Sequence, residues 1–471
     1  MARASDFDDI AARLRAFQRT ADPDQLWPDV PRAARLDGHR RIVSATRAVL
    51  LGDHAWLEAA DDATARAIGI AGFESGMGPL LGWWVERGLV QTSPPLGAIF
   101  ATHLAHGRSR ANKLRAATHA MLSAFRERSM TPVLLKGAHT AYAYFPDPGT
   151  RAGADIDVLV EPEQLELARQ ALRARGLVES HRTVRPFRSE WTPAGSTQVV
   201  RSLDFTHADS PWAIDLRTTL DQPYLGNLRA SLGTPSREQI APYAFDELPA
   251  AVLRQPLLVA YLAIHAAWGI HQIQLVRLVE LVMVLRDDSA HGLLDPESLA
   301  SLLRRTGTDR FAYPALTLAE HLVPGTVHPQ VLGAVEAAPS RTARRVVAAL
   351  ADSGSYRLPH RSVEEKLMWA KGLREQLLAL VHGAWPLGET SSLPDGLALL
   401  RRRAWMLLRR QAGFLAPSGL RPEHGDQGAR GNQAKRPGTH EQRVERERLE
   451  HESPDSGPHH APDFRGPVPP A

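Results

Sequence analysis

Two aspartates at alternate positions, Asp155 and Asp157 in the segment ADIDVLV, are the residues best suited to do chemistry. In a strand, residues i and i+2 face the same side, so both carboxylates would lie together while Ile156 and Val158 face a core. Two adjacent anions repel each other, and a cation between them removes that cost. Carboxylate and phosphate oxygens are the ligands that Mg²⁺ prefers. The pair therefore predicts a site for Mg²⁺ (or Mn²⁺).

A third acid, Asp215 in PWAIDLRTT, is flanked by the apolar residues Ile214 and Leu216. In a strand these would face inward and leave Asp215 on the polar face. If this strand pairs beside the first, three carboxylates converge, which suits a two-metal centre acting on a triphosphate. We therefore predict all three acids to be catalytic and metal-binding, with Asp204 in RSLDFTH as a weaker candidate for the third position.

The segment before the acids contains groups suited to phosphate. PVLLK predicts a short strand and GAHTAYAYF a helix, so Gly137 would begin a helix whose backbone N–H groups could face an anion. Lys136 and Arg151 flank this segment and could neutralise phosphate charge, and Thr150 could donate a hydrogen bond from the turn. We predict Lys136, Gly137 and Arg151 to bind nucleotide.

Each of these features has a plainer interpretation. A lone D-x-D pair is usually just solvated. Here two further features support a metal site: the strand, Gly137 and helix that precede the pair, and Asp215 in a later strand. The Trp83-Trp84 pair is interpreted as core. Four histidines lack the spacing of metal ligands and are interpreted as structural: His139, His207, His265 and His271.

Hydrophobic periodicity divides the chain into four parts. Residues 1–125 are expected to be helical, AWLEAADDATARAIGIAG being one example, and residues 126–245 to alternate strands with helices. Residues 246–413 return to helical patterns from about Leu248 onward. Residues 414–471 are rich in proline, glycine, histidine and charge, and are expected to be disordered. The predicted fold is α+β: a mixed sheet with helices, flanked by helical regions.

Within residues 126–245 the strands are expected in PVLLK, ADIDVLV, LVESHRTV, QVVRSLDFTH and PWAIDLRTTL. EPEQLELARQALRARG predicts an amphipathic helix with Pro162 in its first turn and Gly176 at its end. The glycines from Gly69 to Gly78 follow no strand, so they are interpreted as helix ends and a turn and not as a dinucleotide-binding loop.

Composition narrows the class of protein. Of 471 residues, 43% are hydrophobic and 23% charged, which is typical of folded globular domains. There is no cysteine, so disulfides and thiolate chemistry are excluded. No signal peptide or membrane-spanning run is evident, and we expect a cytoplasmic protein with no membrane partner. The net charge of +4 comes mainly from scattered arginines, which argues against a long nucleic acid as partner.

The stretch LLKGAHTAYAYFPDPGTRAGADIDVLVEPEQLELARQALRARGLV resembles the family of uncharacterised nucleotidyltransferases, a branch of the polymerase-beta-like superfamily. AIDLRTTL resembles the later strand of that family, and the helices around His265 and Arg277-Leu278 resemble its distal region. The matching positions in the first stretch are Leu135, Lys136, Gly137, Tyr144, Pro146, Arg151, Asp155, Asp157, Leu159, Val160, Leu172 and Gly176. The resemblance implies a nucleotidyltransferase fold in which Asp155, Asp157 and Asp215 bind metal.

Three positions depart from that family pattern. Gly137-Ala138 replaces the Gly-Ser of many superfamily members, whose hydroxyl contacts phosphate. Arg217 stands where the family often has histidine, and Glu280 where it often has aspartate.

The function predicted is metal-dependent transfer of a nucleoside monophosphate from an NTP to a hydroxyl of a small molecule, peptide or protein. The alternatives are an inactive protein that uses the same fold to bind a nucleotide or a partner, and a helical scaffold whose acids are only solvated.

Overall fold

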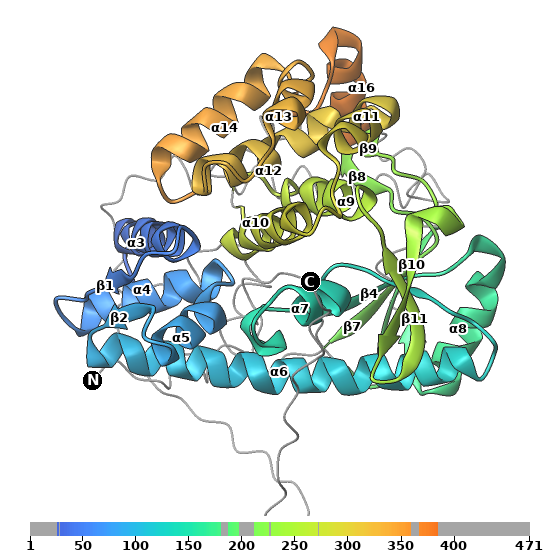
Figure 1. Ribbon diagram of the computed structural model, residues 1–471, viewed down its shortest axis with the longest axis horizontal. Helices are drawn as coiled ribbons and strands as arrows, with labels where there is room; N and C mark the ends of the chain where they lie inside the picture. Colours follow the sequence, from blue (N-terminus) through green and yellow to red (C-terminus); the bar gives the residue numbers. More distant parts are fainter. Residues whose placement is uncertain are drawn as a thin grey trace, which may run out of the picture. The chain divides into compact units, whose positions relative to one another are not determined.

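A mixed sheet of seven strands carries the predicted acids (Figure 1). The computed structural model describes residues 26–27, 29–179, 187–196, 212–225, 228–271, 273–358 and 367–384. In order across the sheet, the strands are β10 (Ile240–Phe245), β11 (Leu248–Leu253), β3 (Val133–Leu134), β4 (Asp155–Leu159), β7 (Ala213–Arg217), β6 (Arg188–Pro193) and β5 (Leu177–Glu179).

Strands β4 and β7 are parallel neighbours in the middle of this sheet, and their register pairs Asp157 with Asp215. Strand β3 is antiparallel to β4, β6 is antiparallel to β7, and β11 is parallel to β3. Paired residues on neighbouring strands face the same side of a sheet. The register therefore brings the third acid beside the first two.

One face of the sheet is closed by α6 (Pro94–Arg126) and α8 (Leu165–Ala174). Ile156 and Val158 of β4 share a buried cluster with Ile214 and Leu216 of β7 and with apolar side chains of both helices. Because side chains alternate along a strand, the intervening aspartates face the opposite side. The core on one face thus fixes the acids on the other.

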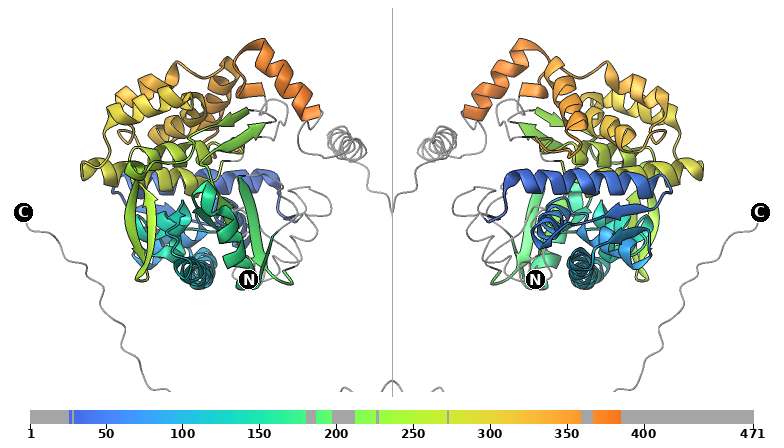
Figure 2. Two further views of the ribbon diagram at one scale, coloured as in Figure 1. Left: turned by 90° about the vertical axis from the view of Figure 1, so that its right-hand side faces the viewer. Right: turned by 90° about the vertical axis from the view of Figure 1, so that its left-hand side faces the viewer.

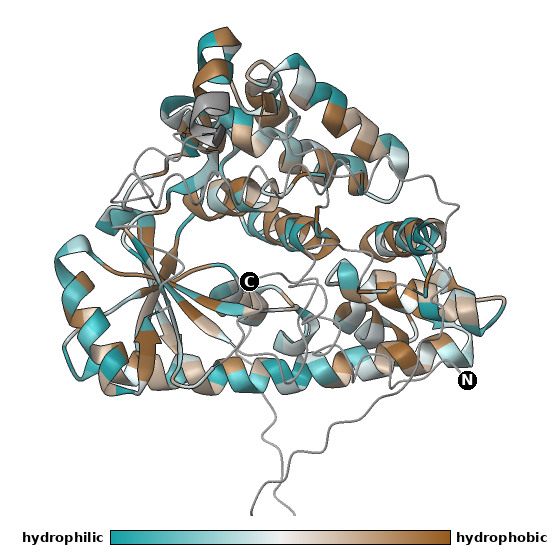
Figure 3. Cartoon of the chain, turned by 180° about the vertical axis from the view of Figure 1, so that it is seen from behind, coloured by the Kyte–Doolittle hydropathy of each residue, from teal (hydrophilic) through white to brown (hydrophobic). Residues whose placement is uncertain are grey.

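The opposite side of the sheet faces the helices that follow it in the chain (Figures 1 and 2). The most apolar of them is α9, coloured largely brown in Figure 3, and every residue of α9 except His265 is buried. These helices are α9 (Leu257–Ala266), α10 (Leu275–Ala290), α11 (Pro296–Thr306), α12 (Asp309–Leu322), α13 (Pro329–Glu336), α14 (Arg341–Ser353) and α16 (Gly372–Ala384). A short hairpin, β8 (Gln222–Leu225) and β9 (Leu228–Ala230), lies between β7 and β10 in the chain.

The part before the sheet contains α3 (Arg32–Leu50), α4 (Asp62–Glu74) and α5 (Gly78–Glu86). The expected helix over AWLEAADDATARAIGIAG begins later than predicted, because Asp61 caps α4 by accepting a hydrogen bond from the Thr64 N–H. Ala55–Leu57 before it forms strand β1, which pairs in parallel with β2 (Val90–Thr92).

The glycines of this region serve close packing. Gly69 and Gly72 lie inside α4, not at its ends. A Cβ on Gly69 would come 2.6 Å from an Ile99 side-chain carbon, so this glycine allows α4 to approach α6 closely. Gly76 adopts a positive φ of 73° in the turn between α4 and α5, as the turn interpretation predicted.

The predicted α+β class is confirmed: a mixed sheet is covered by helices and flanked by helical regions. LVESHRTV forms strand only at Leu177–Glu179 of the part described, and Leu248–Leu253, where helices were expected to resume, forms β11. The predicted strand QVVRSLDFTH, with Asp204, and the segment 414–471 lie outside the described residues. Over the ranges described, no helix has the length and apolar character needed to cross a membrane.

Candidate active site

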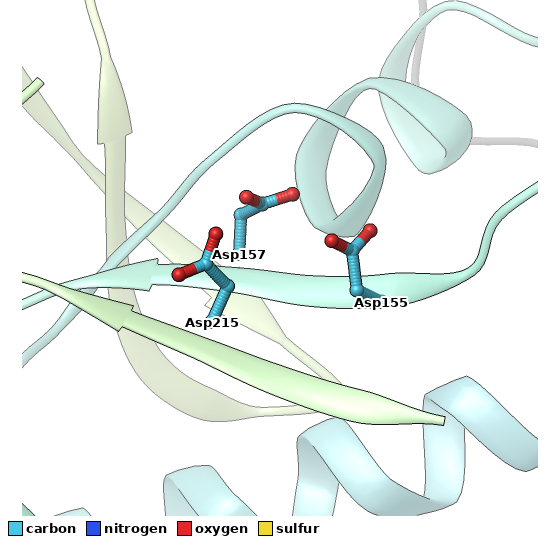
Figure 4. Close-up of side chains that lie close together, drawn as sticks. All are labelled: Asp155, Asp157 and Asp215. Carbon is cyan, nitrogen blue, oxygen red and sulfur yellow. The ribbon is translucent and has the colours of Figure 1, made fainter. Parts of the chain in front are cut away.

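The three predicted acids converge on one side of β4 and β7 (Figure 4). One carboxylate oxygen from each of Asp155, Asp157 and Asp215 lies within 4.8 Å of the others. Asp157 and Asp215 are each 3% exposed, and Asp155 is partly exposed. Three such oxygens close together form a set of hard ligands of the kind that Mg²⁺ and Mn²⁺ take.

Asp157 is held in a buried network of charges. Its Oδ1 lies 2.7 Å from Lys136 Nζ and 3.4 Å from Arg217 Nη2. Burial and the neighbouring Asp155 raise the pKa of Asp157 to about 6, although both cations oppose this shift. The raised pKa is the behaviour expected of a buried carboxyl group that lies beside a second one.

The environment of Asp215 lowers its pKa, whereas that of Asp157 raises it. Arg217 Nη2 donates to its Oδ2 at 2.6 Å, and Arg188 donates to its two oxygens, both at 2.8 Å. Burial alone would raise the pKa of Asp215, but these two guanidinium groups outweigh burial and hold the pKa well below its ordinary value. Asp215 therefore stays ionised at neutral pH, which suits a ligand of cations.

Lys136 stands at the junction between β3 and α7 (Gly137–Ala143). Its backbone has a positive φ of 44°, a strained conformation for a residue with a side chain. The strain is held in place because the Lys136 carbonyl accepts hydrogen bonds from the backbone N–H groups of His139 and Thr140. The loop thereby directs the Lys136 ammonium to Asp157.

Arg151 is fixed beside the start of the same helix. Its Nε and Nη2 each donate at 2.9 Å to one oxygen of Glu280 on α10, and both side chains are buried. The Thr140 hydroxyl also donates to Glu280. A Cβ on Gly137 would come 2.2 Å from Arg151 Nη1, so the glycine lets the guanidinium lie against the backbone.

Several other sequence-based predictions can be compared with this geometry. Thr150 is buried and donates its hydroxyl to the Asp147 carbonyl at 2.6 Å, so in this structure it stabilises its own turn. Of the tryptophan pair, Trp84 is buried and Trp83 is partly exposed, with the Arg87 guanidinium over its ring. His207 lies outside the described residues.

The histidines do not join the acids as metal ligands within the described chain. His139 and His271 are buried, and His139 lies edge-on to the Tyr243 ring. His265 Nδ1 lies 3.2 Å from the side-chain nitrogen of Gln222. This agrees with a structural interpretation of these three side chains.

Sequence reasoning missed Arg188, Glu190 and Tyr261. The first two belong to β6, where Arg188 and Glu190 alternate with Ser189 and Trp191, and the register pairs Glu190 with Asp215. That alternation was the available signal, but the strand itself was not predicted. Tyr261 lies within an apolar helix whose sequence shows no polar face.

Comparison with known proteins identifies the family. A family model described as "uncharacterised nucleotidyltransferase" matches residues 76–324, more than half of the chain, from before α5 to beyond α12. The chain belongs to this family. Membership supports a role in nucleotidyl transfer and the binding of an NTP, and it confirms the resemblance of the LLKG and DIDVLV segments. No curated protein and no solved structure matches the chain.

Nucleotidyltransferases generally use divalent metal ions, and the residues of this chain fit such an ion. The donor set consists of three carboxylates with oxygens close together, two of them buried, which is the kind of oxygen ligand that a hard divalent ion takes. Asp155, Asp157 and Asp215 are thus the candidate ligands.

Proposed function

We propose that this protein transfers a nucleoside monophosphate from an NTP to a hydroxyl group of a small molecule, peptide or protein, with Mg²⁺ or Mn²⁺ held by Asp155, Asp157 and Asp215. The observation that carries the proposal is the convergence of these three carboxylates beside Lys136 and Arg151. Family membership supports the reaction class.

In the proposed reaction the acceptor oxygen attacks the α-phosphorus of the NTP. A new oxygen–phosphorus bond forms, the bond from the α-phosphorus to the bridging oxygen breaks, and pyrophosphate leaves; the hydroxyl proton passes to solvent. Bound divalent ions would neutralise the triphosphate and lower the pKa of the attacking hydroxyl.

The chain's own residues contribute charge and position. Lys136 and Arg151 both bring positive charge to the start of α7, where a triphosphate would be held. Asp215, whose pKa is depressed by Arg217 and Arg188, holds a proton too weakly to store it. Its part is therefore to supply negative charge beside the acceptor oxygen, and the proton leaves by another route.

The first test is a thermal-unfolding titration of the full chain with ATP, GTP, CTP and UTP, each with and without Mg²⁺. A ligand present at about 100 times its Kd adds about 2.7 kcal/mol to the stability of the native state. We expect stabilisation that requires Mg²⁺ and that is lost in the double variant Asp155→Asn/Asp157→Asn.

The matched control is Asp53→Asn/Asp352→Asn, which removes two exposed carboxylates outside the cluster. It should respond to nucleotide as the wild type does. Release of pyrophosphate from the stabilising NTP in the presence of candidate acceptors then tests the transfer. Stabilisation without turnover for any acceptor class would favour the inactive nucleotide-binding alternative. Absence of any nucleotide effect, with the double variant behaving as wild type, would refute the proposal.

A further inference from the structure

The structure leaves one large aromatic side chain exposed at the end of α9. Trp268 is 54% exposed, and within the part of the chain that the structure describes its indole makes no hydrogen bond and no ring contact. Single exposed apolar residues are common on protein surfaces and do not by themselves indicate a binding site. The position of Trp268 relative to the acids is what sets it apart.

Trp268 continues the face of α9 that is directed to the acids. Tyr261, His265 and Trp268 are spaced i, i+4 and i+7, which places them on one side of a helix. The backbone N–H of Trp268 donates to the His265 carbonyl at 3.2 Å, so the helical turn extends to Trp268. Gly269 then ends it with a positive φ of 73°. The three side chains become progressively more exposed, from 0% at Tyr261 to 54% at Trp268.

The inner end of this face lies at the candidate active site. Burial raises the pKa of Tyr261, and the charges of Arg217, Asp157 and Asp215 also act on it, as expected for a ring close to the acids. At a rise of 1.5 Å per residue, Trp268 lies about 10 Å further along the helix axis. That is the reach of roughly one nucleoside.

The middle of the face is tied to the same site by direct contact and by charge. His265 Nδ1 lies 3.2 Å from Gln222, which follows the end of β7 by five positions. Burial lowers the pKa of His265, and the positive charges of Lys136 and Arg277 lower it further. Arg217 and Arg151 act on His265 in the same direction, so His265 lies close to the cations around the acids, and Trp268 follows it by three positions at the end of the helix.

We infer that Trp268 forms the stacking surface for the nucleobase of the bound nucleotide. The inference rests on the proposed function and adds to it the contact that would hold the base. An indole presents a flat apolar face to the π face of any base, so it strengthens nucleotide binding with little preference among bases.

The experiment compares two ligands that differ by the nucleoside. Isothermal titration of the full chain measures the Kd of the NTP that the wild type binds most tightly and the Kd of inorganic tripolyphosphate, both with Mg²⁺. The variants are Trp268→Ala, Trp268→Phe and, as a matched control, Trp56→Ala. Trp56 is 65% exposed on β1, among the helices before the sheet (Figure 1).

We expect Trp268→Ala to weaken NTP binding by about tenfold to a hundredfold and to leave tripolyphosphate binding unchanged. Trp268→Phe should retain most of the affinity, and Trp56→Ala should match the wild type. Wild-type NTP affinity in Trp268→Ala would overturn the inference and leave the proposed function standing. An equal loss of affinity for the NTP and for tripolyphosphate in Trp268→Ala would also overturn the inference, because such a loss would indicate a structural role for Trp268. Failure of the wild type to bind either ligand would refute the proposed function and the inference together.

Discussion

Substitution of Glu280 by glutamine should destabilise the protein strongly, because it leaves the Arg151 guanidinium buried without its counter-charge. The two side chains form a two-pronged ion pair with both N–O distances at 2.9 Å, and they are only 8% and 2% exposed. Removing one partner of such a pair leaves an uncompensated charge away from water, at a cost of about 3–5 kcal/mol.

Removing both charges should cost much less. A buried ion pair is itself expensive to desolvate, so its replacement by apolar side chains of similar volume is often neutral. We therefore expect Arg151→Met/Glu280→Met to recover most of the stability lost in Glu280→Gln. The Thr140 hydroxyl does not lose its only acceptor in this variant, since it also donates to the Lys136 carbonyl at 2.9 Å.

The assay is urea unfolding of the full chain followed by circular dichroism, with the free energies arranged as a double-mutant cycle. The control is Asp246→Asn, which breaks the two-pronged Arg115–Asp246 pair with N–O distances of 2.7 Å at a site where Arg115 is 55% exposed. This exposed pair should contribute at most about 1 kcal/mol. A cost of Glu280→Gln no greater than that of the control, or a double variant as unstable as Glu280→Gln, would contradict this prediction.

Three further predictions concern the start of α7 and strand β4. Gly137→Ala, whose new Cβ would come 2.2 Å from Arg151 Nη1, should lower stability by about 1–3 kcal/mol in thermal unfolding and weaken Mg²⁺-NTP binding; wild-type values for both would contradict the packing argument. Ala138→Ser adds a hydroxyl near the proposed phosphates and should tighten NTP binding by about tenfold in isothermal titration, whereas unchanged affinity would show that the hydroxyl is out of reach. Burial beside Asp155 raises the pKa of Asp157 from 3.8 to about 6, so ionisation of Asp157 reduces wild-type stability as pH rises across that interval. In metal-free buffer the stability of Asp157→Asn relative to wild type should therefore rise between about pH 4 and pH 6 and then level off, and a flat difference in urea unfolding would count against the raised pKa.

The placement of the acids on one face was predictable because side chains in a strand alternate between two faces. Asp155 and Asp157 alternate with apolar residues in ADIDVLV, and Asp215 alternates in the same way in AIDLR, so each segment alone assigns its acids to the polar face. The pairing of Asp157 with Asp215 also requires that two strands more than fifty residues apart lie side by side. The sequence does not establish that these strands are neighbours, so the convergence of the three acids was predicted only for the case in which they are.

The partners of these residues could not be predicted, since they depend on contacts between distant elements. The pairing of Arg151 with Glu280 joins two residues 129 positions apart in the chain, and the prediction of Arg151 as a phosphate-binding residue did not include this partner. Arg188 belongs to a strand that was not predicted, although its residues alternate. The early strand at Ala55–Leu57 was hidden for a related reason, because three residues are too few to establish a period.

The charges around the acids imply that metal ion and nucleotide bind together. Without ligand, the carboxylates of Asp155, Asp157 and Asp215 face three positive side chains, those of Lys136, Arg188 and Arg217, so the formal charges balance. A divalent ion alone would leave excess positive charge in a largely buried site, and a triphosphate alone would crowd the carboxylates with further negative charge. The two together restore the balance. Stabilisation by an NTP should therefore depend steeply on Mg²⁺, and Mg²⁺ alone should have little effect on thermal unfolding.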